Sequence, residues 1–376
     1  MGRRDRGNFD LIRLVAASTV LFSHAFLLTH PRTPEGASTG LDPLEMIDGG
    51  RFSLGSLAVG VFFVVSGYLV AQSWISDPRP LSYLARRVLR IGPGLVSTVV
   101  VTVLLVGPLA TSLTLGHYAA APATRGYLVN ALLYPDQPAL PGIFQHNIWH
   151  SDVNGSLWTL RYEFTWYLVI PLIAWAGVRM ARRVVPVLLA VALAALATLP
   201  RGASDPLPFN LDLALILVLG SYALVGMALY VYRDVIPMRG WIAALLTVLW
   251  VATWRTPLLN VTASVAFGYT AIFLATRSSL GNGRFVPRAD ISYGVYLYGF
   301  LVEQVAVALL GSRANPATVL GLAAPVTAGC ALLSWRLIES PTLRLKARLR
   351  RPAERSVLRG NALPGPAAAE GVAVSL

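Results

Sequence analysis

LGSLAVGVFFVVSGYLVAQSWI, residues 54–75, is an apolar run without a single charged side chain. An α-helix rises 1.5 Å per residue, so about 20 mostly apolar residues cross the hydrocarbon core of a bilayer. Helical cores of soluble proteins rarely need an uninterrupted apolar run of this length. The segment therefore predicts a transmembrane helix.

Nine further apolar runs resemble this one, and together they predict an all-α fold, a polytopic bundle of about ten transmembrane helices. The expected spans are residues 9–29, 54–75, 91–110, 157–178, 184–200, 209–231, 241–256, 259–276, 291–311 and 317–338. The fifth and seventh spans are short for a membrane crossing. We expect one transmembrane domain over residues 1–349, followed by a cytoplasmic tail, 350–376, whose Pro, Ala, Gly and Arg content predicts disorder.

The composition supports a membrane protein and argues against nucleic-acid binding. Hydrophobic residues make up 55% of the chain and charged residues 13%, whereas soluble domains carry about 25% charged residues. The net charge of +13 is distributed over short loops between apolar runs, not over one face that nucleic acid could contact. The single cysteine excludes an intramolecular disulfide and a cysteine-based zinc site.

The distribution of Lys and Arg among the loops predicts the orientation. With a cytoplasmic N-terminus, 22 of the 31 basic residues fall inside, 6 outside and 3 within spans. Cytoplasmic loops carry the excess of positive charge. We therefore expect a protein of the cell (plasma or inner) membrane with both termini on the cytoplasmic side. The first apolar run also resembles a signal peptide, but it contains Arg13 and His24 and no small-residue cleavage site follows. We interpret it as a retained membrane helix.

The first span carries three ionisable residues, Asp10, Arg13 and His24. Arg13 and His24 are eleven residues apart, almost three helical turns, so both project from one face about 16 Å apart along the axis. Ionisable groups inside a membrane are costly and usually functional, which favours His24 as a general base over an interfacial histidine. For Arg13 a snorkelling side chain paired with Asp10 is as plausible as a catalytic one.

Glu163, near the outer end of the fourth span, is expected at a depth similar to that of His24. A carboxylate beside an imidazole raises its basicity and fixes its tautomer. The alternative is that Glu163 pairs with Arg161 at the interface. In the second span Gly67 is expected to pack between helices, while Ser66 either bonds a backbone carbonyl or faces a cavity.

Arg86, Arg87 and Arg90 follow helical spacing at the cytoplasmic mouth. They either anchor the chain by the positive-inside rule or capture phosphate, whose oxygens suit the guanidinium fork. In the long outer loop, about 111–156, His146 and His150 are four residues apart. The loop lacks a helical signal, so we expect acceptor binding there in preference to a metal site.

These residues lie in blocks whose order and spacing resemble acyltransferase family 3, the membrane acyltransferases that include O-antigen acetylases and macrolide acylases. The blocks are Phe9-Asp-Leu-Ile-Arg13 with His24, Phe62-Phe-Val-Val-Ser-Gly67, Arg86-Arg-Val-Leu-Arg-Ile-Gly-Pro93, Asn154-Gly-Ser-Leu-Trp-Thr-Leu-Arg-Tyr-Glu163, Ser292-Tyr-Gly-Val-Tyr-Leu297 and Ile338-Glu-Ser-Pro341. One departure is Gly299, which stands where many members have histidine.

The resemblance implies an acyl-CoA donor, commonly acetyl-CoA, and a hydroxyl of an extracytoplasmic glycan or glycosylated small molecule as acceptor. It implies His24 as the base supported by Arg13 and Glu163, with the three arginines 86, 87 and 90 binding the donor. The expected substrate contacts are Asn154, Ser156, Trp158, Tyr293 and Tyr296, and the expected supporting residues are Asp10, Ser66 and Gly67. A transporter or flippase of lipid-linked glycan, and a membrane scaffold or sensor, are the alternative functions.

Overall fold

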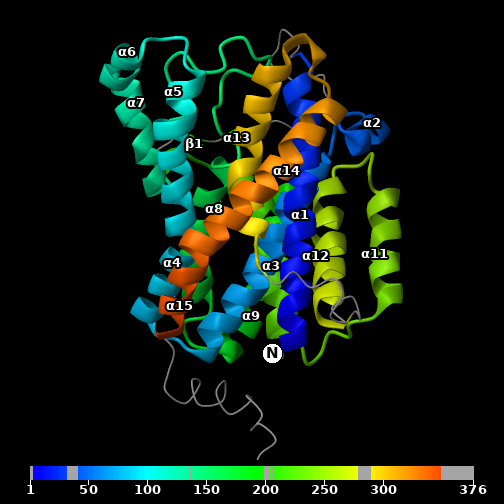
Figure 1. Ribbon diagram of the computed structural model, residues 1–376. Helices are drawn as coiled ribbons and strands as arrows, with labels where there is room; N and C mark the ends of the chain where they lie inside the picture. The colour runs from blue at the N-terminus through cyan, green and yellow to red at the C-terminus, as the bar shows by residue number, and fades with distance from the viewer. Residues whose placement is uncertain are drawn as a thin grey trace, which may run out of the picture.

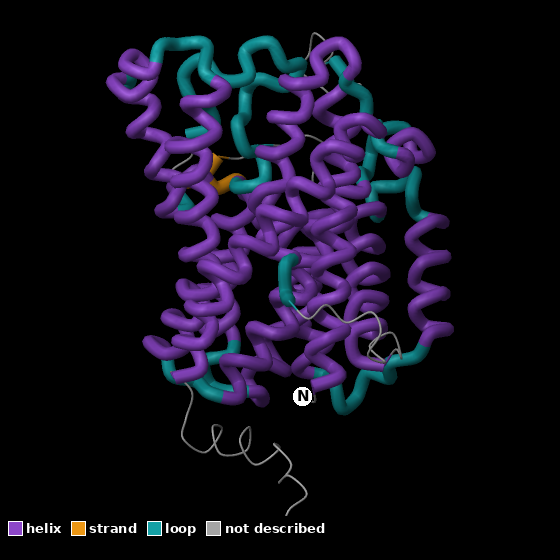
Figure 2. Tube along the Cα trace, viewed as in Figure 1, coloured by secondary structure: helices purple, strands orange, loops and turns teal. Residues whose placement is uncertain are grey.

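The computed structural model describes residues 3–31, 41–134, 137–198, 204, 206–277 and 289–348. Nearly all regular structure in these ranges is helical (Figure 2). The exception is a small antiparallel ribbon of β1 (Pro206–Leu207) and β2 (Leu211–Asp212), in which Pro206 lies opposite Asp212. The predicted disordered tail, 350–376, lies outside the described residues.

Ten helices run alternately up and down through the described part of the molecule (Figure 1). They are α1 (Arg3–Thr29), α3 (Leu54–Ser76), α4 (Pro80–Val101), α8 (Trp158–Ile173), α9 (Val178–Thr198), α10 (Leu213–Val231), α11 (Gly240–Ala252), α12 (Leu259–Arg277), α13 (Ser292–Leu310) and α14 (Pro316–Ser334). The shorter helices are α2 (Pro43–Asp48), α5 (Gly107–Ala110), α6 (Leu115–Ala120), α7 (Pro122–Gly126) and α15 (Ser340–Arg348). Two π-helical turns, Thr102–Val106 and Trp335–Glu339, and three 3₁₀ turns, Tyr127–Leu132, Pro208–Asn210 and Gly311–Arg313, complete the helical structure of these ranges.

Eight helical segments of the described chain are long and apolar enough to cross a membrane, which confirms the predicted multi-pass helical bundle. They are Asn8–Thr29, Leu54–Ser76, Pro80–Ala110, Val178–Thr198, Leu213–Val231, Leu259–Arg277, Ser292–Arg313 and Pro316–Arg344. The other two predicted spans correspond to α8, with 16 residues, and α11, with 13. The seventh span is thus short as expected, whereas the fifth, α9, has 21 residues.

Helix boundaries differ from the sequence prediction by up to eleven residues. The third helix begins at Pro80, eleven residues before the predicted start, and continues through a π-helical turn to Ala110. The fourth ends at Ile173, before Gly177, whose positive φ of 83° breaks the helix. An apolar run indicates where lipid begins, but a helix can start well before it, here with proline at its first position. The arginine motif therefore lies on α4 and not in a loop before it.

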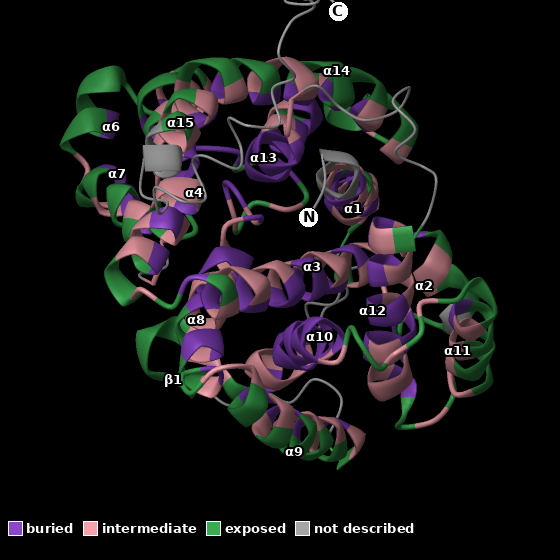
Figure 3. Ribbon diagram, turned by 90° about the horizontal axis from the view of Figure 1, so that it is seen from below, coloured by how far each residue is buried: buried purple, intermediate pink, exposed green. Residues whose placement is uncertain are grey.

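α3, α10 and α13 lie buried inside the bundle, while α9 and α11 expose apolar side chains at its edge (Figure 3). α3 and α10 approach closely because glycines face each other. A Cβ at Gly67 would lie 2.1 Å from the carbonyl oxygen of Ala223, and one at Gly226 would lie 2.0 Å from that of Val64. Only glycine allows backbones to come this near, so Gly67 packs between helices as the sequence analysis expected.

The two ends of the bundle carry different structures (Figure 1). α1 begins and α15 ends at the same end. The distribution of basic residues predicts that this end faces the cytoplasm, and we call it the cytoplasmic end. The opposite, outer end carries α2, α5 to α7, the ribbon and the long loop that leads into α8. A site with access from both sides of a membrane would need openings at both ends.

Candidate active site

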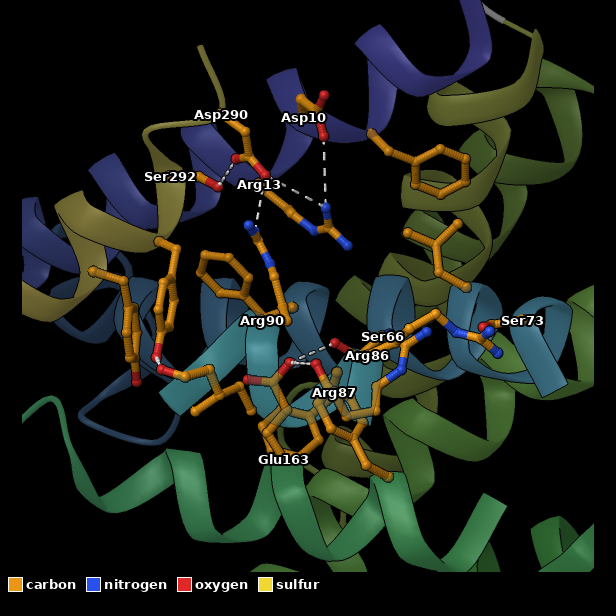
Figure 4. A pocket seen from close by; sticks show the side chains of 18 of the residues that line it. Asp10, Arg13, Ser66, Ser73, Arg86, Arg87, Arg90, Glu163, Asp290 and Ser292 are labelled. Atoms are coloured by element: carbon orange, nitrogen blue, oxygen red, sulfur yellow. Dashed lines mark hydrogen bonds and ion pairs between the residues drawn. The ribbon is translucent and has the colours of Figure 1, made fainter. Parts of the chain in front are cut away.

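A cavity of about 550 Å³ lies at the cytoplasmic end, between α1, α3, α4, α8 and α13 (Figure 4). Its charged lining residues are Asp10, Arg13, Asp77, Arg86, Arg87, Arg90, Glu163 and Asp290. We call it the basic cavity after its four arginines, which come from α1 and α4. α4 supplies three of them, since helical spacing of three and four residues places them along one side of the helix.

Three of the four arginines are already paired with carboxylates. Arg86 is buried and lies 2.9 Å from Asp77, and Arg90 lies 2.8 Å from Asp290. Arg13 lies 3.5 Å from Asp10 and 4.0 Å from the same Asp290 (Figure 4). Asp290 therefore joins the first helix to α4.

Arg87 is held in a different way. Its guanidinium lies 5.3 Å from the ring centroids of both Tyr83 and Tyr167, a distance typical of cation–π contacts. Its buried Nε has no hydrogen-bond partner among the described residues. Arg87 is thus fixed by two aromatic rings while retaining a donor for an incoming anion.

The carboxylates near the cytoplasmic end are held in their charged form. Hydrogen bonding from Arg79, aided by Arg86, lowers the pKa of Asp77 to about 2. Burial alone would raise the pKa of Asp290, but the charges of Arg90 and Arg13 lower it overall. Asp77 and Asp290 therefore remain ionised beside their arginines at neutral pH.

Glu163 lies at the inner part of the basic cavity. Its carboxylate accepts a hydrogen bond of 2.9 Å from Ser66, and Tyr167 donates a second one to the same oxygen. Beyond it, Tyr296 hydrogen-bonds to Thr159 and packs at 5.5 Å, centroid to centroid, against Phe62. All three side chains line the basic cavity.

A second cavity, of about 180 Å³, lies at the outer end and is lined by His24. The long loop covers it with Tyr127, Asn130, Gln137, Pro138, Trp149, Asp152, Asn154 and Gly155. We call it the histidine cavity. The ring of His24 packs edge-on against Phe300, with centroids 5.0 Å apart, and its Nδ1 lies 3.8 Å from a carboxylate oxygen of Glu303.

Neighbouring residues of the chain line the two cavities. Thr159 lines the basic cavity, and Trp158 beside it lines the histidine cavity. On α13 the same change occurs over one turn, from Tyr296 to Phe300. The pair of cavities thus follows a line between the two ends of the bundle.

Comparison with known proteins identifies the family of this chain. The family model of an acyltransferase domain, the third acyltransferase family, matches residues 6–335. The chain belongs to acyltransferase family 3. This acyltransferase is 29% identical over 336 residues to an O-acetyl transferase of Shigella phage Sf6, covering 88% of this chain and 94% of the relative. It is 29% identical over 371 residues to Nodulation protein 10 of Rhizobium leguminosarum bv. viciae, covering 92% and 95%. No solved structure shows significant similarity to it.

The structure of the acyltransferase separates the expected pair of His24 and Glu163. Each lines a different cavity, and the carboxylate next to His24 belongs to Glu303 on α13. Arg13 likewise lies with Asp10 and Asp290 in the basic cavity, not beside the histidine. The sequence analysis compared depths along helices, but contact also depends on which helices are neighbours, and α1 packs mainly against α13 and α3.

The expected substrate contacts divide between the two cavities. Asn154 and Trp158 line the histidine cavity, and Tyr293 and Tyr296 line the basic cavity. Ser156 is buried and lines neither, with no hydrogen-bond partner for its hydroxyl among the described residues. In the long loop His146 and His150 are exposed and line neither cavity.

Three acidic residues were missing from the sequence analysis: Asp77, Asp290 and Glu303. Glu303 had a clear signal, because a carboxylate within a predicted span is costly and therefore a functional candidate. Asp77 and Asp290 lie just outside helices, and only their contacts with arginines give them a role.

Proposed function

We propose that this membrane O-acyltransferase lies in the cell membrane and moves an acyl group, specifically acetyl, from acyl-CoA to a hydroxyl group. The acceptor hydroxyl belongs to an extracytoplasmic glycan or glycosylated small molecule. The observation that carries the proposal is the pair of cavities: a basic one at the cytoplasmic end and one with a histidine at the outer end. The O-acetyl transferase of phage Sf6 supports acetyl as the group transferred.

The basic cavity has the chemistry needed for the donor. Acyl-CoA is cytoplasmic and carries three phosphate groups, whose oxygens accept the forked hydrogen bonds of arginine. Arg87 presents an uncommitted donor there, and Arg86 and Arg90 add guanidinium groups that ion pairs with carboxylates hold in place. The thin acyl-pantetheine arm would extend past Glu163 toward Tyr296 and Phe62, which line the same cavity.

The histidine cavity has the chemistry needed for the acceptor. Trp149 and Trp158 offer flat apolar surfaces, and Asn130 and Asp152 offer polar groups, in the same small volume. Such a mixture suits a sugar, which has apolar ring faces and hydroxyl edges. His24 is the titratable ring within this cavity whose nitrogen can take the proton of an acceptor hydroxyl.

In the proposed reaction His24 removes the proton of the acceptor hydroxyl as its oxygen attacks the thioester carbonyl carbon. The new ester C–O bond forms, the C–S bond breaks, and the proton held by His24 passes to the departing thiolate of coenzyme A. The acyl group must reach the histidine cavity, so the side chains of Tyr296, Phe62 and Thr159 must separate during each turnover. The short distance between the cavities along α8 and α13 makes this a local movement.

The test uses inverted membrane vesicles, whose cytoplasmic face is outermost. Labelled acetyl-CoA is added outside, and label is then measured in the glycan and glycolipid fraction of the lumen. Wild-type vesicles should transfer label. Vesicles with an equal amount of H24A should transfer it at least 100-fold more slowly, because general base catalysis contributes about 10²–10⁴-fold to a rate. Full activity of H24A would contradict the mechanism, and absence of transfer by the wild type would contradict the function.

A further inference from the structure

Glu303 is a buried ionisable residue that the proposed reaction does not yet use. It lies within α13, has no exposed surface, and neither carboxylate oxygen has a hydrogen-bond partner among the described residues. An ionised carboxylate buried without a partner destabilises a protein by several kcal/mol. Retention of such a group inside an otherwise apolar helix requires a compensating contact.

His24 supplies that contact. Its Nδ1 lies 3.8 Å from Oε2 of Glu303, and Phe300, one turn earlier on α13, packs edge-on against the same ring. α1 can approach α13 because Gly299 has no side chain: a Cβ there would lie 3.0 Å from Leu21. Two groups on one face of α13 therefore contact the imidazole.

Other titratable groups near His24 are occupied or do not reach it. Asp152 and Tyr127 line the same cavity, but the Asp152 carboxylate accepts hydrogen bonds within its own loop. Asp42 bonds Ser23, next to His24, and also accepts from backbone amides of α2 and α3. α3 and α14, which also pack against α1, contain no Asp, Glu, Lys, Arg or His.

We propose that Glu303 is the positioning residue of His24: its carboxylate keeps a proton on Nδ1 and thereby leaves the lone pair of Nε2 for the acceptor hydroxyl. The inference rests on the proposed function, in which His24 is the base. The distance of 3.8 Å exceeds that of a hydrogen bond, and catalytic hydrogen bonds are often long before substrate is bound. A second residue that orients the base is the common arrangement of nucleophilic and general-base catalysis.

The proton balance explains why a carboxylate is suited to this place. Before reaction the pair carries one proton, on Nδ1, and one negative charge on Glu303. When Nε2 accepts the hydroxyl proton, the Nδ1 proton is shared with Glu303, so the pair becomes neutral overall and no isolated imidazolium is left in a low-dielectric site. When the thiolate leaves, it takes the proton from Nε2 and the pair returns to its first state.

The experiment measures the rate of acetyl transfer by membrane vesicles that contain E303Q, with labelled acetyl-CoA at saturation. The rate is measured over a range of pH values, with the same pH on both sides of the membrane. In metal sites, loss of the group that orients a histidine ligand costs about 10–100-fold. We expect E303Q to lower the rate by a similar factor, with the donor KM within about twofold of wild type. The acidic limb of the pH–rate profile should move to lower pH, because the negative charge that favours the protonated ring is gone. E303D keeps the charge, so it should recover part of the rate. The acidic limb of its pH–rate profile should lie at the same pH as that of the wild type.

The control is D234N, which removes an exposed carboxylate paired with Arg182 at the cytoplasmic end and should leave rate and profile unchanged. If E303Q does not fold, E303L replaces it, since an apolar side chain of similar volume avoids a buried unpaired amide. A wild-type rate in E303Q or E303L would overturn the inference, as would equal losses in E303Q and E303D with an unmoved limb. Wild-type vesicles without any transfer would overturn the proposed function and this inference together.

Discussion

Among the individual residues, the arginines of the basic cavity illustrate how neighbours divide labour within one motif. Three residues of the same type follow one another on α4, yet Arg86 and Arg90 are paired with carboxylates and Arg87 is held between two tyrosines. An ion pair spends part of a guanidinium's hydrogen-bonding capacity, whereas an aromatic contact leaves its edge free. Arg87 should therefore contribute most to donor binding.

For this reason we expect R87A to raise the KM for acetyl-CoA about 10- to 100-fold with a smaller effect on kcat. The factor corresponds to about 1.5–3 kcal/mol for a hydrogen bond to a charged group. Initial rates of acetyl transfer at varied acetyl-CoA concentration measure it. R125A, at an exposed arginine of α7 on the outer end, is the matched control, and an R87A enzyme with the KM of the control would exclude Arg87 from the donor site.

Between elements, the contact of Asp77 with Arg86 ties the end of α3 to the start of α4. Both side chains are buried, and the Arg86 guanidinium also donates to Ser82. Removing one partner of a buried ion pair leaves the other charge uncompensated, which destabilises a protein by about 3–5 kcal/mol. The turn between these two helices thus depends on a single carboxylate.

D77N should therefore lower the thermal unfolding temperature by several degrees at neutral pH. Because the pKa of Asp77 is lowered from 3.8 to about 2 in the folded protein, the stabilisation is fully present above pH 4 and is lost as the pH falls from about 4 through about 2. Thermal scans in detergent should show a constant gap between wild type and D77N from pH 5 to 8 that narrows below pH 4. A gap that widened on acidification would contradict the ion pair as its cause.

For the whole molecule, the orientation of everything after α10 depends on whether α11 crosses the membrane. Its 13 residues span about 20 Å at 1.5 Å per residue, less than the hydrocarbon core of about 30 Å. Short spans are accommodated by local thinning of the bilayer and by interfacial aromatic residues. Trp241 and Trp250, near the two ends of α11, and Trp254 just beyond it have the positions that such anchoring requires.

We expect opposite accessibility on the two sides of α11. In a Cys330→Ala background, R255C should react with a membrane-impermeant maleimide added to intact cells, and V235C should react only after permeabilisation. Both positions are exposed in loops that flank α11, so differences in burial do not explain a difference in labelling. Equal labelling of the two in intact cells would show that α11 does not cross and would reverse the sides assigned to α12, α13 and α14.

The membrane bundle and the family could both be predicted from the amino-acid sequence. Length, apolarity and charge are properties of a segment and its solvent, so residues 54–75 predict a span whatever their neighbours are. The predicted orientation depends only on counting Lys and Arg in loops. Motif order along the chain likewise requires no coordinates, and the family match over residues 6–335 confirms it.

The carboxylate that lies beside His24 could be identified only from the packing of the helices. Glu163 and Glu303 both lie in apolar helices, and the sequence does not show which of the two carboxylates lies beside His24. α1 packs its histidine face against α13, where Gly299 allows close approach, and this places Glu303 beside His24. Such a contact depends on the rotation and neighbours of helices far apart in sequence, which are set by the shapes of their packed surfaces and not by local hydrophobicity.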